Sequence, residues 1–231
     1  MHNEELKALF DQQAAGYDQQ WAGMAPIRDN LHFLMGSLFS GLPEDARILC
    51  VGVGTGVEIG YLAARFPGWR FTAVDPSGAM LEVCRERARR GGFVERCNFH
   101  EGYLDTLDSA RKHDGATCFL VSQFFLDPSA RSAFFGEIAA RLKPSGVLAS
   151  ADLAADTASP AYEVLLHAWM TLMSGAGVQP EMLERARAAY ARDVAILPAA
   201  RVGQIIEAAG FASSVVFFQA GLMQGWVSRM P

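Results

Sequence analysis

The sequence predicts a single α/β domain, in which a mostly parallel sheet carries helices on both faces. Strand-like and helix-like segments alternate through most of the 231 residues, and this alternation is typical of such a sheet. The run Ile48–Val51 is short and wholly apolar, as in a strand buried on both faces. Hydrophobic residues make up 51% of the chain, so it can form a sizeable core.

Turn-forming residues divide the first quarter of the chain. Helices are expected over residues 3–15 and Ile27–Phe39, before a turn at Pro43-Glu44-Asp45. The buried strand Ile48–Val51 leads directly into a glycine-rich loop. A helix over Val57–Phe66 follows and stops at a Pro-Gly pair.

The next segments continue the alternation. A strand over Phe71–Val74 ends in Asp75, and Ser77 is a suitable N-cap for a helix that runs to Arg90 before two glycines. A weaker strand is expected around Cys97–Glu101, and a fourth over Ala116–Val121. These segments complete the central part of the predicted sheet.

The last hundred residues predict further helices and a hairpin. Asp127-Pro128 has the cap-then-proline order that starts a helix, and a strand is expected over Val147–Asp152. Residues 158–193 are expected to be helical with a break at 174–177, followed by a helix over Pro198–Ala209. Strands over 214–218 and 223–228 are joined at Ala220-Gly221, so the final strand should run antiparallel to the rest.

The glycine loop predicts a nucleoside site. Gly52-Val53-Gly54-Thr55-Gly56 follows the first strand, and Asp75 ends the second strand 19 residues later. Parallel sheets bind ligands at the carboxyl ends of their strands, where a carboxylate can accept both hydroxyls of a ribose. A dinucleotide fingerprint would need a third glycine at Val57 or Ile59, so NAD is not favoured.

At these residues the chain resembles the class I S-adenosylmethionine-dependent methyltransferases. Phe10-Asp11 with Tyr17-Asp18 resembles their N-terminal signature, and Leu142–Gly146 resembles the turn before their fifth strand. The resemblance implies a Rossmann-like seven-stranded mostly parallel sheet with an antiparallel last strand. It also implies one domain with four parts: an N-terminal helical lid (1–42), a cofactor-binding core (43–153), a helical substrate cap (154–200), and a C-terminal helix and hairpin (201–231).

The resemblance further implies S-adenosylmethionine, or its demethylated product S-adenosylhomocysteine, as the bound cofactor. In the family, Met80 would pack on adenine, and Tyr17 would fold over the methionine part. Two departures are Cys50, where many members carry an acid, and Tyr103, which stands in the place of an acid beside adenine. The residues expected to bind the cofactor are Tyr17, Arg28, Gly52, Gly54, Thr55, Gly56, Asp75, Pro76, Met80, Gly102, Tyr103, Leu104, Val121, Ser122 and Gln123.

The acceptor pocket is expected between the lid, the end of the fourth strand and the cap. Helical spacing places Tyr162, Leu166, Trp169 and Met173 on one face. This face is interpreted either as core packing or a dimer interface, or as an apolar lid over a small substrate. The residues expected to line the substrate are Trp169, Met173, Arg187 and Tyr190, and His167 is the candidate general base.

The second half is closest to the carboxy-S-adenosylmethionine synthases. The match rests on Phe125–Arg131 and on Glu207–Phe211. It would place Arg187 where those enzymes hold the extra carboxylate of their product, formed with prephenate. This activity is therefore the alternative to methyl transfer on a small molecule, and a cofactor-binding protein without catalysis is the third hypothesis.

Composition and motifs limit the kinds of partner that the chain is expected to bind. The net charge is −5, and the densest basic run, Arg85–Arg90, is expected to complement a helix dipole rather than a phosphate or a tRNA. Val121–Phe124 lacks the N-P-P-Y motif, so a DNA substrate is not expected. The four cysteines form no metal-binding pattern, and neither a signal peptide nor a membrane span is expected. A cytoplasmic location and a homodimer are further expectations.

Overall fold

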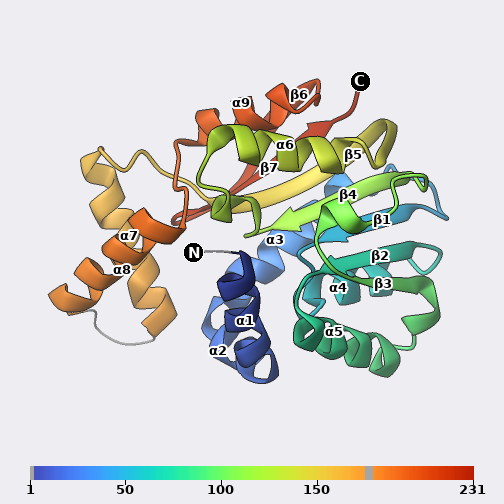
Figure 1. The fold of residues 1–231 in the computed structure, drawn as a ribbon, viewed down its shortest axis with the longest axis horizontal. Coiled ribbons are helices and arrows are strands. Elements are labelled where there is room, and N and C mark those ends of the chain that lie inside the picture. The colour runs from blue at the N-terminus through green and yellow to red at the C-terminus, as the bar shows by residue number, and fades with distance from the viewer. Residues whose placement is uncertain (1–2, 175–178) are drawn as a thin grey trace.

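The computed structural model describes residues 3–174 and 179–231, and its centre is a seven-stranded sheet (Figure 1). The strand order is β3-β2-β1-β4-β5-β7-β6, and the pairs from β3 to β5 are parallel. Strand β7 runs antiparallel to both of its neighbours, which confirms the predicted sheet. The strands are β1 (Arg47–Val51), β2 (Arg70–Asp75), β3 (Cys97–Glu101), β4 (His113–Phe119), β5 (Leu142–Leu153), β6 (Ser213–Ala220) and β7 (Met223–Arg229).

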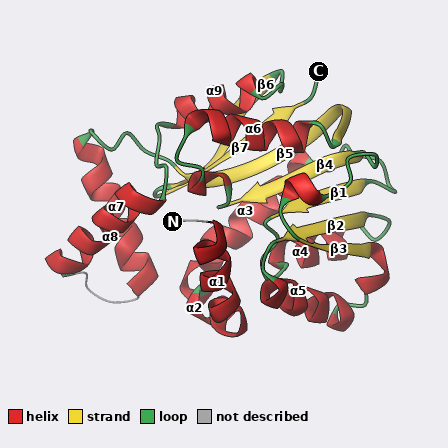
Figure 2. Ribbon diagram, in the orientation of Figure 1, coloured by secondary structure: helices red, strands yellow, loops and turns green. Residues whose placement is uncertain are grey.

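Helices surround this sheet and form a separate pair at one end of it (Figure 2). They are α1 (Asn3–Gln13), α2 (Tyr17–Gln20), α3 (Ala25–Leu38), α4 (Val57–Arg65), α5 (Gly78–Arg90), α6 (Pro128–Ala139), α7 (Pro160–Ser174), α8 (Pro180–Asp193) and α9 (Ala199–Ala208). Two predicted caps are confirmed: Ser77 accepts a hydrogen bond from the amide of Met80, and Asp127 accepts from those of Ser129 and Ala130. Residues 175–177 of the predicted break lie outside the described residues.

Several boundaries differ from the predicted ones; β4, for example, covers His113–Phe119 rather than Ala116–Val121. Strand β5 begins at Leu142 rather than Val147, because the turn before it pairs with β4, and Ser145 there has a φ of 61°. The first predicted helix ends at Gln13, where a 3-10 turn leads into α2. That turn brings Tyr17 back toward the sheet, which matters for the site below.

The two faces of the sheet follow the alternation of side chains along each strand. In β1, Ile48 and Cys50 pack in the cluster formed with α3, α4 and α5. Leu49 and Val51 pack on the other face, with α6 and α9. Since all four side chains are at most 3% exposed, β1 is buried on both faces, as its unbroken apolar run predicts.

A third apolar cluster joins α7 and α8 to the antiparallel end of the sheet. Tyr162, Leu166 and Trp169 are at most 5% exposed, and they pack with Leu153 and Phe218. The shared helical face of α7 is therefore core packing, which was one of the two interpretations of its sequence. No helix among the described residues is long and apolar enough to cross a membrane.

Candidate functional site

The glycine loop after β1 adopts a conformation that side chains would prevent. Gly52, Gly54 and Gly56 have φ values of 64°, 53° and 75°, in the left-handed region that favours glycine. A Cβ at Gly52 would lie 2.2 Å from Cγ2 of Val121, and one at Gly56 would lie 2.3 Å from Sγ of Cys84. Gly54 instead has no atom within 4 Å of that position, so its backbone faces open space.

Asp75 holds this loop in place from the end of β2. One carboxylate oxygen accepts from the amide of Gly54 at 2.8 Å, and the other accepts from the amide of Ser77 at 2.9 Å. The side chain is buried, with 8% of the residue exposed, and this burial raises the pKa of the carboxyl group above its usual value. Asp75 thus connects the first two strands at the position where a ribose would lie.

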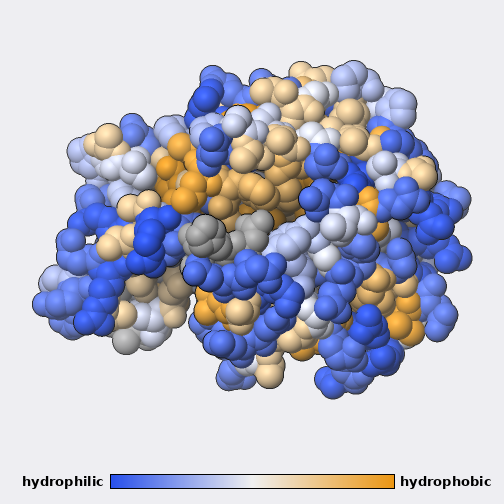
Figure 3. Space-filling model, in the orientation of Figure 1, coloured by the Kyte–Doolittle hydropathy of each residue, from blue (hydrophilic) through white to orange (hydrophobic). Residues whose placement is uncertain are grey.

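A cavity of about 200 Å³ opens beside Gly54 and Asp75. Many of its walls are aromatic, including Phe10, Phe124, Phe125 and Phe134. Figure 3 shows apolar residues gathered in the hollow between the α7–α8 pair and the rest of the molecule. The predicted cofactor residues that line the cavity are Tyr17, Gly52, Gly54, Asp75, Pro76, Met80, Gly102, Tyr103, Leu104 and Val121.

The N-terminal segment, residues 3–21, closes one side of this cavity. Phe10 and Tyr17 both line it, and their rings meet edge to face, with centroids 6.3 Å apart. The Ser77 hydroxyl donates to Asp11 at 2.6 Å, and the Thr55 hydroxyl donates to Asp18 at 2.7 Å. The segment is therefore fastened to the glycine loop and to the start of α5.

Two further features of the cavity fit a polar ligand with a flat ring. The hydroxyl of Tyr103 is buried and has no hydrogen-bond partner among the described residues, and such orphan groups call for an explanation. Leu120, which follows β4 and lines the cavity, has a φ of 59°, a strained conformation for a leucine. Asp75, Met80 and Tyr103 lie together in these walls.

Some predicted cofactor residues lie outside the cavity wall. Thr55 is committed to Asp18, and Gly56 packs against Cys84. Arg28, on α3, pairs with the neighbouring Asp29 at 2.9 Å. Thr55 and Gly56 therefore shape the loop from behind, while Arg28 is engaged by a carboxylate of its own chain.

Ser122 and Gln123 also lie outside the cavity wall, in a buried polar network behind it. Arg131 and Asp152 form an ion pair at 3.0 Å, with side chains 0% and 1% exposed. Ser122 accepts from Arg131 and donates to Asp152, whose other oxygen accepts from the amide of Gln123. Arg131 also donates to the carbonyl of Ala195 at 3.1 Å, so the network connects the end of β4 to the segment after α8.

The predicted substrate-lining residues mostly contact one another. Trp169 donates its indole N–H to the hydroxyl of Tyr190 at 3.0 Å, and that hydroxyl lies 3.7 Å from the sulfur of Met173. Arg187 pairs with Glu163 and Glu184. His167 is exposed on α7 and is not among the cavity residues.

A buried acid that the sequence analysis missed lies under the glycine loop. Glu58, on α4, is 8% exposed, and its carboxyl accepts a hydrogen bond from Thr117 at 3.0 Å. Burial raises its pKa from 4.5 to about 8, and Glu58 in turn contributes to the raised pKa of Cys50. Cys50 and Glu58 therefore lie close enough for the charge of one to affect the other beneath the loop.

This raised pKa predicts how stability depends on pH. Between pH 4.5 and 8, the folded chain holds a proton on Glu58 that the unfolded chain releases. The free energy of unfolding should therefore fall by up to about 1.4 kcal/mol per pH unit over that window. The Glu58→Gln variant should lose this dependence and be more stable than the native chain at pH 9, by about 2–4 kcal/mol.

Urea unfolding of both proteins between pH 5 and 9 measures this difference, and the subtraction removes the contributions of all other groups. Parallel curves for the two proteins would show that Glu58 titrates normally.

Other charged and sulfur-containing residues form ion pairs on the surface or lie in the core. Arg85, Arg89 and Arg90 pair with Glu82 and Glu86 on α5 itself. Cys50 and Cys118 are 0% exposed in the core. The described residues contain no group of three metal-binding side chains.

Comparisons with known proteins agree with this geometry. A family model described as a methyltransferase domain matches residues 48–146, the part that contains the loop, Asp75 and the Tyr103 turn. Erythromycin 3''-O-methyltransferase from Saccharopolyspora erythraea is 31% identical over 115 residues, covering 49% of this chain and 37% of that protein. Malonyl-[acyl-carrier protein] O-methyltransferase from Laribacter hongkongensis is 28% identical over 158 residues, covering 66% and 51%.

A solved structure shares almost the whole fold. DhpI in complex with S-adenosylhomocysteine superposes with a TM-score of 0.68 at 17% identity, covering 98% of this chain and 96% of that chain. The curated relatives are longer, since the chain spans about half of their length or less.

Proposed function

We propose that this chain, whose residues 48–146 match a methyltransferase domain, is a class I S-adenosylmethionine-dependent methyltransferase that transfers a methyl group to a small-molecule acceptor. The observation that carries the proposal is the pairing of the left-handed glycine loop with Asp75 at the wall of one cavity. The family's cofactor is S-adenosylmethionine, and the aromatic walls beyond Asp75 offer an acceptor an apolar surface rather than a basic groove.

Different residues at the cavity would bind different parts of the cofactor. Asp75 would accept the ribose hydroxyls, while the backbone of Gly54 admits the ligand at close range. Met80 and Tyr103 would hold the adenine on either side, with the free hydroxyl of Tyr103 available to a ring nitrogen. Tyr17 would cover the methionine part from the N-terminal segment.

Positioning of the acceptor would then account for most of the acceleration of methyl transfer. The bound cofactor supplies an already activated methyl group on a sulfonium. Two titratable side chains at the cavity, Tyr17 and Lys7, hold their protons at neutral pH. Burial raises the pKa of Tyr17 to about 12, and Lys7 is paired with Asp11, which raises its pKa. Holding the acceptor in line at about 3–3.5 Å from the methyl group can contribute roughly 7–11 kcal/mol.

The proposal predicts that both S-adenosylmethionine and S-adenosylhomocysteine bind with dissociation constants below about 1 mM, measured by isothermal titration. Labelled methyl groups should then appear on members of a panel of small-molecule acceptors. Absence of binding for both nucleosides would overturn the proposal at its first step.

Mass spectrometry of the nucleoside that co-purifies separates this proposal from its alternatives. A species heavier than S-adenosylmethionine by one carboxylate in place of hydrogen would replace methyl transfer with the carboxylated cofactor chemistry. Bound cofactor without transfer to any acceptor would instead indicate a binding protein.

A further inference from the structure

The amino-end edge of the sheet carries one arginine for each of four neighbouring strands. Arg70 and Arg47 are the first residues of β2 and β1, and they are direct partners in the strand register. Arg96 immediately precedes β3, and Arg111 lies two residues before β4. Neighbouring strands are about 4.8 Å apart, so these positions form a row roughly 15 Å long.

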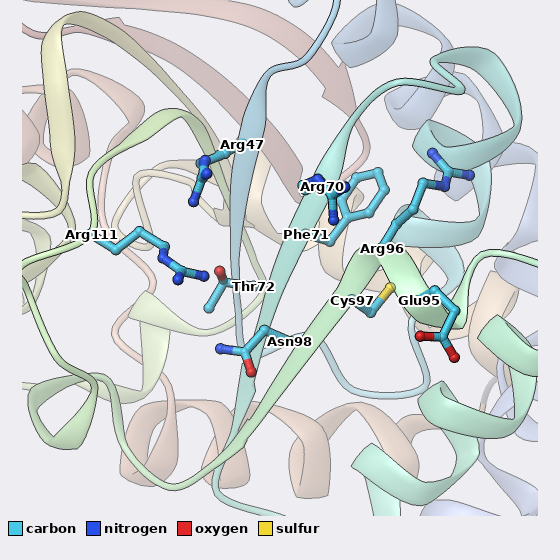
Figure 4. Close-up of a pocket in the computed structure, with 9 residues that line it drawn as sticks. All are labelled: Arg47, Arg70, Phe71, Thr72, Glu95, Arg96, Cys97, Asn98 and Arg111. Carbon is cyan, nitrogen blue, oxygen red and sulfur yellow. The ribbon is translucent and has the colours of Figure 1, made fainter.

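These arginines surround a hollow of about 110 Å³ (Figure 4). Arg47 and Arg111 point toward Thr72, and the amide of Asn98 lies nearby. Glu95 is the acid among the residues that line the hollow, and its carboxylate lies on the far side, near Cys97. The side of the hollow formed by Arg47, Thr72 and Arg111 is therefore positively charged.

The four arginines differ in how they are bonded. The guanidinium of Arg96 donates to the carbonyls of Ala63, Phe66 and Trp69, which gives it a structural role. The side chains of three arginines make no hydrogen bond or ion pair with any of the described residues, namely Arg47, Arg70 and Arg111.

Nearby groups do not neutralise these three arginines. The carboxylate of Asp114 is occupied by the amide of Arg47 and by the ammonium of Lys143. The imidazole of His113 lies beneath, where its Nδ1 faces the carbonyl of Arg141 and its Nε2 faces the hydroxyl of Thr72 at 3.0 Å. Burial first, then the charges of Arg111 and Arg47, lower the pKa of His113. The charges of these two arginines thus reach a buried ring, on which the carboxylate of Asp114 acts in the opposite direction.

We propose that this hollow is a second ligand site, in which Arg47, Arg70 and Arg111 bind the phosphate group of a small phosphorylated molecule. Guanidiniums match phosphate oxygens in pairs of parallel hydrogen bonds, and three of them suit a doubly charged group. The volume accommodates a phosphate and a few further atoms. Since β1 separates the hollow from the glycine loop by five residues, or about 15 Å, the ligand is distinct from the methyl-transfer cofactor.

Inorganic pyrophosphate and inorganic phosphate are the probes, titrated at low salt into the full chain. We expect pyrophosphate to bind with a dissociation constant below about 1 mM and each of Arg47→Gln, Arg70→Gln and Arg111→Gln to weaken binding about tenfold. Arg201→Gln is the matched control, because Arg201 is an exposed arginine on α9 outside the hollow. It should leave pyrophosphate binding unchanged.

Thermal unfolding provides a second measurement that does not depend on knowing the natural ligand. Three uncompensated positive charges repel one another, so Arg70→Gln should raise the melting temperature at low salt. Pyrophosphate should raise the melting temperature of the native chain and leave that of the triple variant unchanged.

Three outcomes would overturn the proposal: no binding of either probe below about 5 mM, binding that survives in the triple variant, or an equal loss in Arg201→Gln. Much tighter binding of a short single-stranded RNA, lost in the triple variant, would reassign the row to a nucleic acid. S-adenosylmethionine binding, measured in the same variants, should stay unchanged, so failure at this site and failure of the methyl-transfer proposal are distinguishable.

Discussion

Replacing Asp75 by alanine is expected to lower the affinity for S-adenosylmethionine at least about a hundredfold. The carboxylate would accept two ribose hydroxyls, and hydrogen bonds to a charged group contribute about 1.5–3 kcal/mol each. The same carboxylate already holds the amides of Gly54 and Ser77. The variant therefore loses both the acceptor for the ribose and the brace for the loop. Isothermal titration measures the change.

Two further variants make the Asp75 result interpretable. Asp75→Asn keeps the shape and one acceptor, so it should bind more tightly than the alanine variant and more weakly than the native chain. Asp105→Ala removes an exposed acid just after Tyr103 and should leave the affinity unchanged. An unchanged affinity in Asp75→Ala, with native circular dichroism, would show that the ribose lies elsewhere.

Replacing Arg131 by methionine is expected to lower the free energy of unfolding by about 3–5 kcal/mol, since it leaves a buried carboxylate without its partner. Asp152 is 0% exposed and could not be rehydrated without opening the core. For a chain of this size the melting temperature should fall by about 6–20 °C. Differential scanning calorimetry and urea unfolding measure both quantities.

The cause can be tested by removing the other charge as well. The double variant Arg131→Met, Asp152→Leu leaves no buried charge without a partner, so much of the lost stability should return. Arg187→Met removes two ion pairs, with Glu163 and Glu184, whose arginine side chain is 37% exposed, and should cost less than about 1 kcal/mol. If Arg131→Met were as mild as Arg187→Met, the buried pair would contribute little to the fold.

Local sequence patterns account for most of the sheet and for the glycine loop. The apolar run of β1 and the caps at Ser77 and Asp127 depend on neighbours a few residues away, and the glycine loop is recognised by the spacing of its own glycines. The antiparallel end of the sheet was predicted from the hairpin at Ala220-Gly221, whereas the order of the strands came only from the structure.

The contacts that the sequence did not predict are between residues far apart in the chain. Arg131 meets Asp152 across 21 residues, and Thr117 meets Glu58 across 59. No spacing rule marks such partners, so Ser122 and Gln123 were predicted at the cofactor when they serve a buried network. Arg187 was expected to contact substrate from a family resemblance and Trp169 from helical spacing, and the structure gives them partners on α7 and α8.

Three interactions fasten the N-terminal segment beside the cavity: the hydrogen bonds from Ser77 to Asp11 and from Thr55 to Asp18, and the ion pair of Asp18 with Arg87. They affect the rate at which a ligand exchanges. At about 1 kcal/mol each, breaking all three would leave roughly one molecule in a hundred open at any moment. For a ligand that enters and leaves on the side closed by this segment, the scarcity of the open form slows both steps by the same factor. The dissociation constant is then unchanged, while each bound molecule stays about a hundred times longer than it would in a cavity without these three interactions.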